Sequence, residues 1–257
     1  MRIVIKVGSS SLSRHEGGLS LPKLATLMDQ VACLWEGGHE IVLVTSAAVP
    51  TGRDLLHVDG GSLLEKQALA AVGQARLIQM YQKEAAQFGR VVGQILLTRE
   101  DLEVVDRRNS LKQTMQTLLQ LNALPVINEN DSVSVEELLY GDNDTLAARV
   151  AILMAADLVV LLTDIDGYYE EDPKVHPEAN RLRKVSEITD DMIQSAGGAG
   201  SVMGTGGMVT KLLAAKIATS AGIPLVICQS EARRVLERVV AGEDEGTRFE
   251  VSGRVTR

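Results

Sequence analysis

The sequence predicts an α/β protein with a mainly parallel central sheet that is covered by helices on both faces. Short runs of β-branched and apolar residues alternate with longer helical patterns along all 257 residues. The predicted strands are apolar throughout, which is typical of strands buried on both faces. Hydrophobic residues make up 45% of the chain, which is ample for a large core. We expect one domain over residues 1–257, built as a three-layer α/β/α sandwich.

The first half of the chain contains four predicted strands, RIVIKV, EIVLVT, VVGQILLT and LPVIN. Between them, helical patterns cover residues 20–36, about 62–88 and about 108–122. The first of these helices has one apolar face, made of Leu24, Leu27, Val31 and Leu34. Ser20 is a helix-start signal and Gly37 a helix-stop signal at its two ends.

In the second half, a helix is expected to begin at DNDTLAARVAILMAA, and LVVLLT reads as a buried strand. The segment IDGYYEEDP predicts a hairpin or flap. The glycine-rich stretch GGAGSVMGTGG then leads into the helix MVTKLLAAKIATSAG and the strand IPLVIC. Strands separated by helices in this way are typical of parallel sheets.

Charge and composition exclude several classes of partner. Lysine and arginine number 26 against 34 aspartates and glutamates, so the net charge is −8. An acidic chain without a basic stripe argues against nucleic-acid and membrane-surface binding. The run VAILMAADLVVLL carries Asp157 and is shorter than the roughly 18 residues of a membrane span. With no secretory signal and only Cys33 and Cys228, expected as buried thiols, we predict a cytoplasmic protein.

Polar clusters follow four of the predicted strands. They are KVGSS, TSAAVPTG, NENDS and TDIDG. In an open α/β sheet, ligands bind beyond the carboxyl ends of the strands, so these clusters predict a site along one edge. Read alone, each cluster is also compatible with an ordinary turn.

Several familiar sites are excluded by spacing. A P-loop needs a glycine directly before its lysine, but Thr210 precedes Lys211. The dinucleotide fingerprint fails because Val209 stands where its third glycine is required. The four histidines are His15, His39, His57 and His176, and their scatter argues against a zinc site or a serine triad. We expect no metal held by a protein cage.

Two lysines beside glycine-rich loops favour phosphoryl chemistry. Lys6 lies inside an apolar strand, where a lysine requires an anionic partner. The following Gly8 and Ser9 can offer backbone N–H groups to an anion. Lys211 lies near the start of a helix after GTGG, where backbone can approach a phosphate. Phosphoryl transfer depends mainly on positioning and charge stabilisation, which such groups supply.

The motifs IKVGSS, VTSAAV, QILLTR, PVINENDSV, GDND, LLTDIDGYY and GTGGMVTKL together resemble the amino-acid kinase family, and within it the γ-glutamyl kinases. The resemblance covers essentially the whole chain. It implies the amino-acid kinase fold, with acceptor binding in residues up to about 150 and nucleotide binding in about 151–257. It also implies ATP-dependent phosphorylation of the γ-carboxylate of L-glutamate, the first step of proline biosynthesis.

The resemblance also implies residue roles. Lys6, Asp144 and Lys211 would be catalytic, with Asp144 organising the two lysines. Glutamate would be bound by Ser46, Asp131 and Asn143. The nucleotide would be held by Lys6, Gly8, Ser9, Thr163, Asp164, Thr205, Gly206, Gly207, Met208, Val209, Thr210 and Lys211.

A carboxylate substrate agrees with the residues that are missing. A glutamate side chain has a reference pKa of about 4.3 and needs no general base at neutral pH. The expected cofactors are ATP and Mg²⁺, and Mg²⁺ commonly binds phosphate oxygens and retains waters. The resemblance further implies a homo-oligomer (dimer or tetramer), proline as feedback inhibitor and a functional link to γ-glutamyl phosphate reductase. We expect no C-terminal RNA-modification-type (PUA) domain.

The loop after the second strand departs from the family pattern. It reads Ser46-Ala47-Ala48 where Ser-Gly-Ala is common, and Pro50 and Thr51 replace small residues. Ala47 lacks the freedom of glycine at positive φ. Two alternatives therefore stay open: a kinase of this fold acting on acetylglutamate, aspartate or carbamate, and a non-catalytic sensor of nucleotide or amino acid.

Overall fold

The computed structural model describes residues 1–14, 17–59, 61–133, 143–171, 173, 175–197 and 207–251. Its centre is an eight-stranded sheet with the strand order β3-β4-β2-β1-β5-β9-β10-β8. The six strands from β3 to β9 in this order are parallel to their neighbours, and β10 runs antiparallel to β9. The strands of this sheet are β1 (Arg2–Val7), β2 (Glu40–Thr45), β3 (Val91–Leu97), β4 (Ala123–Glu129), β5 (Leu158–Thr163), β8 (Lys184–Val185), β9 (Leu225–Gln229) and β10 (Thr247–Phe249).

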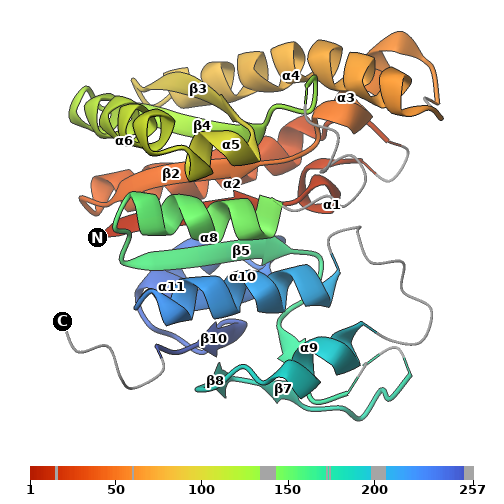
Figure 1. Cartoon of the computed structure of the whole chain (residues 1–257), viewed down its shortest axis with the longest axis vertical. Coiled ribbons are helices and arrows are strands. Elements are labelled where there is room, and N and C mark those ends of the chain that lie inside the picture. Colours follow the sequence, from red (N-terminus) through yellow and green to blue (C-terminus); the bar gives the residue numbers. More distant parts are fainter. Residues whose placement is uncertain are drawn as a thin grey trace.

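Helices cover both faces of the sheet (Figure 1). Alternate residues of each strand point to opposite faces, so Val4 joins one apolar core and Ile3 and Ile5 join the other. The first core is shared with α6, α8 and α10, and the second with α2, α4 and α11. The predicted three-layer sandwich is therefore confirmed. The helices are α1 (Ser9–Leu12), α2 (Leu21–Glu36), α3 (Ala48–Leu56), α4 (Leu63–Ala86), α5 (Arg99–Glu103), α6 (Val105–Gln120), α8 (Asn143–Leu153), α9 (Asp190–Ala196), α10 (Met208–Ser220) and α11 (Val235–Val240).

The helix α3 was not predicted from the sequence, and it packs very closely on α4. A Cβ atom on Gly52 would stand 1.9 Å from the carbonyl oxygen of Leu69, and one on Gly73 would stand 1.8 Å from that of Ala48. Only glycine fits at both positions. The packing with α4 thus stabilises a short helix whose own residues, with Pro50 and Gly52 inside it, are poor helix formers.

The remaining differences are local. The expected hairpin after β5 is present as β6 (Tyr168–Tyr169) paired antiparallel with β7 (Arg181–Leu182). Cys228 is buried as predicted, but the prediction for Cys33 is wrong because it lies on the exposed side of α2. Among the described residues, every helix is too short or too polar to cross a membrane.

The carboxyl ends of the parallel strands lie at a single edge of the sheet. Lys6 and Thr45 are near the ends of β1 and β2, Asn128 is near the end of β4, and Thr163 ends β5. The register pairs Val7 with Thr45 on one side and with Leu162 on the other. Because β4 pairs with β2 on its other side, all four predicted strand-end clusters follow neighbouring strands, as expected for an open α/β sheet.

Candidate active site

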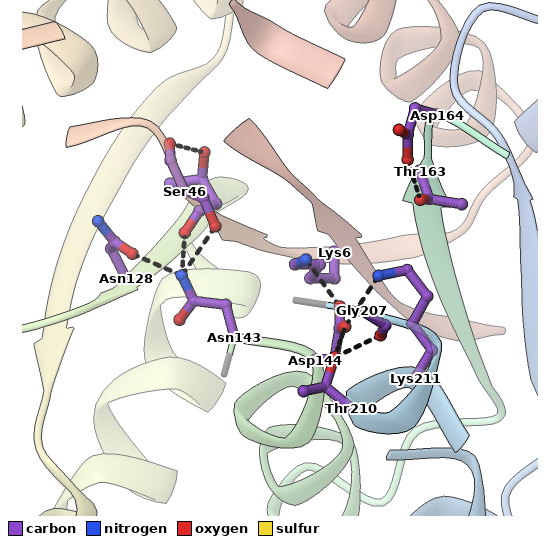
Figure 2. A network of polar contacts seen from close by, with 11 residues as sticks. Lys6, Ser46, Asn128, Asn143, Asp144, Thr163, Asp164, Gly207, Thr210 and Lys211 are labelled. Carbon is purple, nitrogen blue, oxygen red and sulfur yellow. Dashed lines mark hydrogen bonds and ion pairs between the residues drawn. The ribbon is translucent and has the colours of Figure 1, made fainter. Parts of the chain in front are cut away.

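Two lysines from different parts of the chain meet at one aspartate (Figure 2). Lys6 Nζ lies 2.7 Å from Asp144 Oδ1, and Lys211 Nζ lies 3.2 Å from Asp144 Oδ2. Lys6 is 7% exposed, Lys211 is 5% exposed and Asp144 is 1% exposed. The predicted catalytic residues thus form one buried cluster.

Strand parity and helix starts explain how the cluster forms. Lys6 is two residues after Val4 in β1, so its side chain leaves the sheet on the face covered by α8 and α10. Asp144 is in the first turn of α8, and Lys211 is in the first turn of α10. The amino ends of both helices therefore meet the carboxyl end of β1, and such helix ends favour anions.

The two lysines and Thr210 control the ionisation of Asp144. Burial opposes ionisation of Asp144, but the two lysines and the Thr210 hydroxyl lower the pKa of this carboxyl below its ordinary value. Thr210 donates to Asp144 Oδ2 at 2.8 Å. A carboxylate between two ammonium groups, at the amino ends of two helices, makes a place that suits an anionic ligand such as a phosphate group.

A second polar group begins at the neighbouring residue, Asn143. Its side-chain nitrogen, which carries two hydrogens, is within hydrogen-bond distance of three acceptors: the Thr45 carbonyl oxygen at 2.9 Å, Ser46 Oγ at 3.0 Å and Asn128 Oδ1 at 3.0 Å. Asn143 is 9% exposed and Asn128 is 2% exposed. Because Asn143 and Asp144 are consecutive, the polar group and the lysine cluster are adjacent (Figure 2).

The loop that carries Ser46 has positive φ at Ala47, a conformation for which alanine lacks the freedom of glycine. Ala47 precedes α3 with φ = 82°, a left-handed conformation that favours glycine. Ala47 is also 3% exposed, so the conformation is held inside the fold. The turn places Ser46 within reach of Asn143 at the expense of backbone strain.

Asp131 follows β4 and is half-buried. Burial, and next the nearby Glu129 carboxylate, raise the pKa of Asp131 to about 6. Among the described residues, no cationic side chain pairs with Asp131. A half-buried carboxylate of this kind is suited to a cationic ligand.

The predicted nucleotide residues divide into two groups. Gly207, Met208, Val209, Thr210 and Lys211 form the start of α10 at the lysine cluster, and Gly8 lies against Lys6, since a Cβ at this glycine would stand 3.5 Å from Lys6 Nζ. Ser9 is exposed in α1. Thr163 and Asp164 end β5, joined by a hydrogen bond of 2.9 Å, and lie apart from the cluster in Figure 2. Thr205 and Gly206 lie outside the described residues.

Sequence reasoning missed three residues that support the site. Asn128 lies inside the INEND motif and could have been found there. Gln74 accepts a hydrogen bond from Asn128, and the Tyr81 hydroxyl lies 2.8 Å from Thr45 Oγ1. Both come from α4, where no motif or spacing marks them.

Comparisons with known proteins match most of the chain. The model of the amino acid kinase family matches residues 1–229. The chain is 48% identical to "Glutamate 5-kinase" of Symbiobacterium thermophilum, with 98% of this chain and 97% of that protein covered. It is 46% identical to "Glutamate 5-kinase" of Caldanaerobacter subterraneus subsp. tengcongensis, with 97% of this chain and 68% of that protein covered.

A solved structure shows the same fold at low identity. The crystal structure of the UMP kinase from Bacillus anthracis aligns with a TM-score of 0.67 and 15% identity, covering 99% of this chain and 97% of that one. This likeness concerns the fold alone. The family model and the close relatives cover most of the chain, and the chain therefore belongs to the amino acid kinase family.

Proposed function

We propose that this chain transfers the γ-phosphoryl group of ATP to the γ-carboxylate of L-glutamate, the first step of proline biosynthesis. The observation that carries the proposal is the buried cluster in which Asp144 lies between Lys6 and Lys211. The relatives named glutamate 5-kinase, at 46% and 48% identity over nearly the whole chain, support the choice of glutamate.

The chemistry is a direct displacement at phosphorus. A γ-carboxylate oxygen of glutamate forms a bond to the γ-phosphorus of ATP, and the bond from this phosphorus to the bridging oxygen of ADP breaks. The products are γ-glutamyl phosphate and ADP. The carboxylate is ionised at neutral pH, so no general base is required. The main barrier is repulsion between two anions, which the charges of Lys6 and Lys211 offset.

The two lysines would have different roles, because Lys6 is in β1 and Lys211 is near the start of α10. Lys6, beside Gly8, would contact the transferring group, and Lys211 at the start of α10 would stabilise the charge that develops on the leaving ADP. Asp144 would hold both ammonium groups in place and touches each of them directly. Two ammonium groups at the amino ends of α8 and α10 are suited to bind an ATP phosphate.

The cluster is also compatible with Mg²⁺ bound to ATP. The described residues contain no group of three or more histidine, cysteine, aspartate or glutamate side chains that could hold a metal ion. Asp144 is already occupied by two lysines, which makes it a poor metal ligand. Phosphate oxygens and water would therefore supply most of the ligands, and the ion would neutralise charge on the phosphates when bound.

Glutamate would be bound by Ser46, Asp131 and Asn143. A free amino acid offers an ammonium group, which pairs with a carboxylate such as Asp131. The raised pKa of Asp131, at about 6, fits a carboxylate that lacks its cation until the substrate binds. The Ser46 hydroxyl, which the Asn143 amide reaches, can donate to the substrate carboxylate.

Further properties implied by the resemblance stay predictions. They are acceptor binding by residues up to about 150, nucleotide binding by about 151–257, a dimer or tetramer, inhibition by proline, a link to γ-glutamyl phosphate reductase and a cytoplasmic location. Thr163 and Asp164 belong to the proposed nucleotide site.

The proposal is tested by trapping the acyl phosphate with hydroxylamine in the presence of ATP and Mg²⁺. Glutamate, aspartate, acetylglutamate and carbamate are compared as phosphoryl acceptors. Signal with glutamate alone is the expected result. Signal with another acid would keep the kinase chemistry and overturn the substrate. ATP binding without any acyl phosphate would favour the sensor alternative.

A further inference from the structure

A chain of three amide side chains connects the interior of α4 with the proposed glutamate site. Asn128 donates to Gln74 Oε1 at 2.9 Å, and Asn143 donates to Asn128 Oδ1 at 3.0 Å. Gln74 is 8% exposed and is fifty-four positions away from Asn128 in the sequence. This glutamine belongs to none of the motifs that mark the site.

The direction of this chain is determined at the Thr45 end. A backbone carbonyl oxygen can only accept, so Asn143 must turn its nitrogen toward Thr45. The same nitrogen also donates to the side-chain oxygen of Asn128. The side-chain nitrogen of Asn128 therefore needs an acceptor other than Asn143. Gln74 provides that acceptor. The three amides are thus joined in one arrangement, in which the orientation of each depends on its neighbour.

One hydrogen-bond acceptor of Asn143 is not used in this arrangement. Asn143 Oδ1 is buried and, within the described part of the chain, accepts no hydrogen bond. A buried acceptor without a donor is unfavourable unless a ligand supplies the donor. The α-ammonium of a free amino acid is such a donor, whereas an acylated or deaminated substrate offers fewer N–H groups or none.

We propose that Gln74 is a positioning residue for substrate selection: it holds Asn128, and through it Asn143, so that Asn143 Oδ1 is presented to the α-ammonium of the amino acid. The inference rests on the proposed function, since it concerns the same substrate. Gln74 itself touches only Asn128 in this network. Its contribution is to the orientation of Asn143 and has no direct part in phosphoryl transfer.

A second residue of α4 supports the same network from the other end. Tyr81 lies seven positions after Gln74, which places both side chains on one face of the helix. Its hydroxyl lies 2.8 Å from Thr45 Oγ1, and Tyr81 is fully buried. The residue whose carbonyl orients Asn143 is therefore itself held by α4.

The test compares steady-state kinetics of the full chain and its variants with glutamate and with glutarate, which lacks the ammonium group. Gln74→Met has a similar volume and no hydrogen-bond acceptor. We expect it to raise the glutamate KM by about tenfold or more, with kcat changed by less than about threefold. The ATP KM and the activity with glutarate should be unchanged, so the preference for glutamate falls by the same factor. Gln74→Glu keeps an oxygen acceptor and should restore the wild-type preference.

Gln79→Met is the matched control, because Gln79 is exposed on the same helix and accepts a hydrogen bond from Arg76. It should leave all constants unchanged. If Gln74→Met does not fold, Gln74→Asn withdraws the acceptor with a smaller change in volume, and the same rise in glutamate KM is expected. A wild-type glutamate KM and preference in the folded variant would overturn the inference.

Failure of the proposed function would look different. In that case the wild-type chain itself would make no acyl phosphate from glutamate. Calorimetric titration of glutamate into the wild-type chain and Gln74→Met then decides the inference: weaker binding to the variant supports it, and equal binding, or none to either, overturns it.

Discussion

Lys6 and Asp144, which are 138 positions apart in a chain of 257, form an ion pair of 2.7 Å that is almost completely buried. The pair joins the carboxyl end of β1 to the first turn of α8, and Lys211 closes it from α10. Buried ion pairs of this kind contribute little net stability relative to apolar packing. Their presence is better explained by the anionic ligand that two lysines at the amino ends of α8 and α10 are suited to bind.

Replacing Asp144 by asparagine should make stability depend more strongly on ATP. Asp144→Asn removes the negative charge that lies between two buried ammonium groups, so we expect the free energy of unfolding to fall by about 3 kcal/mol. ATP supplies negative charge to the same place, so saturating ATP should raise the urea midpoint of the variant more than that of the wild type. Turnover should drop by about a hundredfold.

Asp190→Asn is the control, because Asp190 is paired with Lys216 at the surface. Its urea midpoint should equal that of the wild type. The pKa of Asp144 is lowered from an ordinary value of 3.8, so its contribution is complete above that pH and is lost as the pH falls further. An Asp144→Asn variant as stable as the wild type without ATP would contradict this account.

Replacing Asp131 should raise the stability of the protein and weaken the binding of glutamate. Its pKa of about 6 lies above the ordinary value of 3.8, so the folded state binds a proton more tightly than the unfolded state. Stability contributed by this group is therefore lost as the pH rises from about 4 to about 6. Asp131→Asn should raise the free energy of unfolding at pH 8 by about 1–2 kcal/mol, after allowance for partial exposure, with no gain at pH 4.

The same variant should bind glutamate more weakly, with a KM about tenfold higher or more. In the wild type, the glutamate KM should rise as the pH falls below about 6, because a protonated Asp131 cannot pair with an ammonium group. Glu129→Gln removes a neighbouring negative charge and should move this inflection to lower pH. A glutamate KM that does not depend on pH between 5 and 8 (about one unit on the acid side and two on the alkaline side of the inflection) would count against Asp131 as a substrate contact.

Ala47 offers a test of the strained loop. Ala47→Gly removes a Cβ atom from a residue with φ = 82°, so we expect the free energy of unfolding to rise by about 1 kcal/mol. Urea denaturation measures the change, and the glutamate KM should stay within about twofold because the backbone conformation is retained. Ala48→Gly, one residue later at the start of α3, should give no gain. A less stable Ala47→Gly variant would show that the loop is not strained.

The sequence predicted the parts of the site that depend on local pattern. A lysine inside an apolar strand and a lysine after a glycine-rich loop both indicated an anion site, and both lie in the cluster. The apolar strands and long helices predicted the layered sheet for the same reason, since periodicity is a local property. Asp144 and Asn143 came from the resemblance, because an aspartate and an asparagine at a helix start also read as ordinary caps.

The parts that could not be predicted depend on long-range packing. Gln74 and Tyr81 are two of many residues in α4, and their roles arise only because α4 packs under the ends of β2 and β4. The helix α3 depends on Gly52 and Gly73 for its close contact with α4, which no local propensity indicates. Comparison with the family pattern pointed to the residue at position 47, where glycine is common, and the backbone of Ala47 is left-handed.

The central claim is that the two lysines act on the phosphoryl group, and single-turnover transfer from γ-labelled ATP to glutamate tests it most directly. Lys6→Met and Lys211→Met each leave Asp144 paired with the other lysine, so both variants should fold and bind ATP. Lys216→Met, an exposed lysine of α10, is the control and should transfer label at the wild-type rate. We predict transfer that is slower by about a hundredfold or more in both cluster variants. Transfer at close to the wild-type rate in either of them would contradict the role assigned to that lysine.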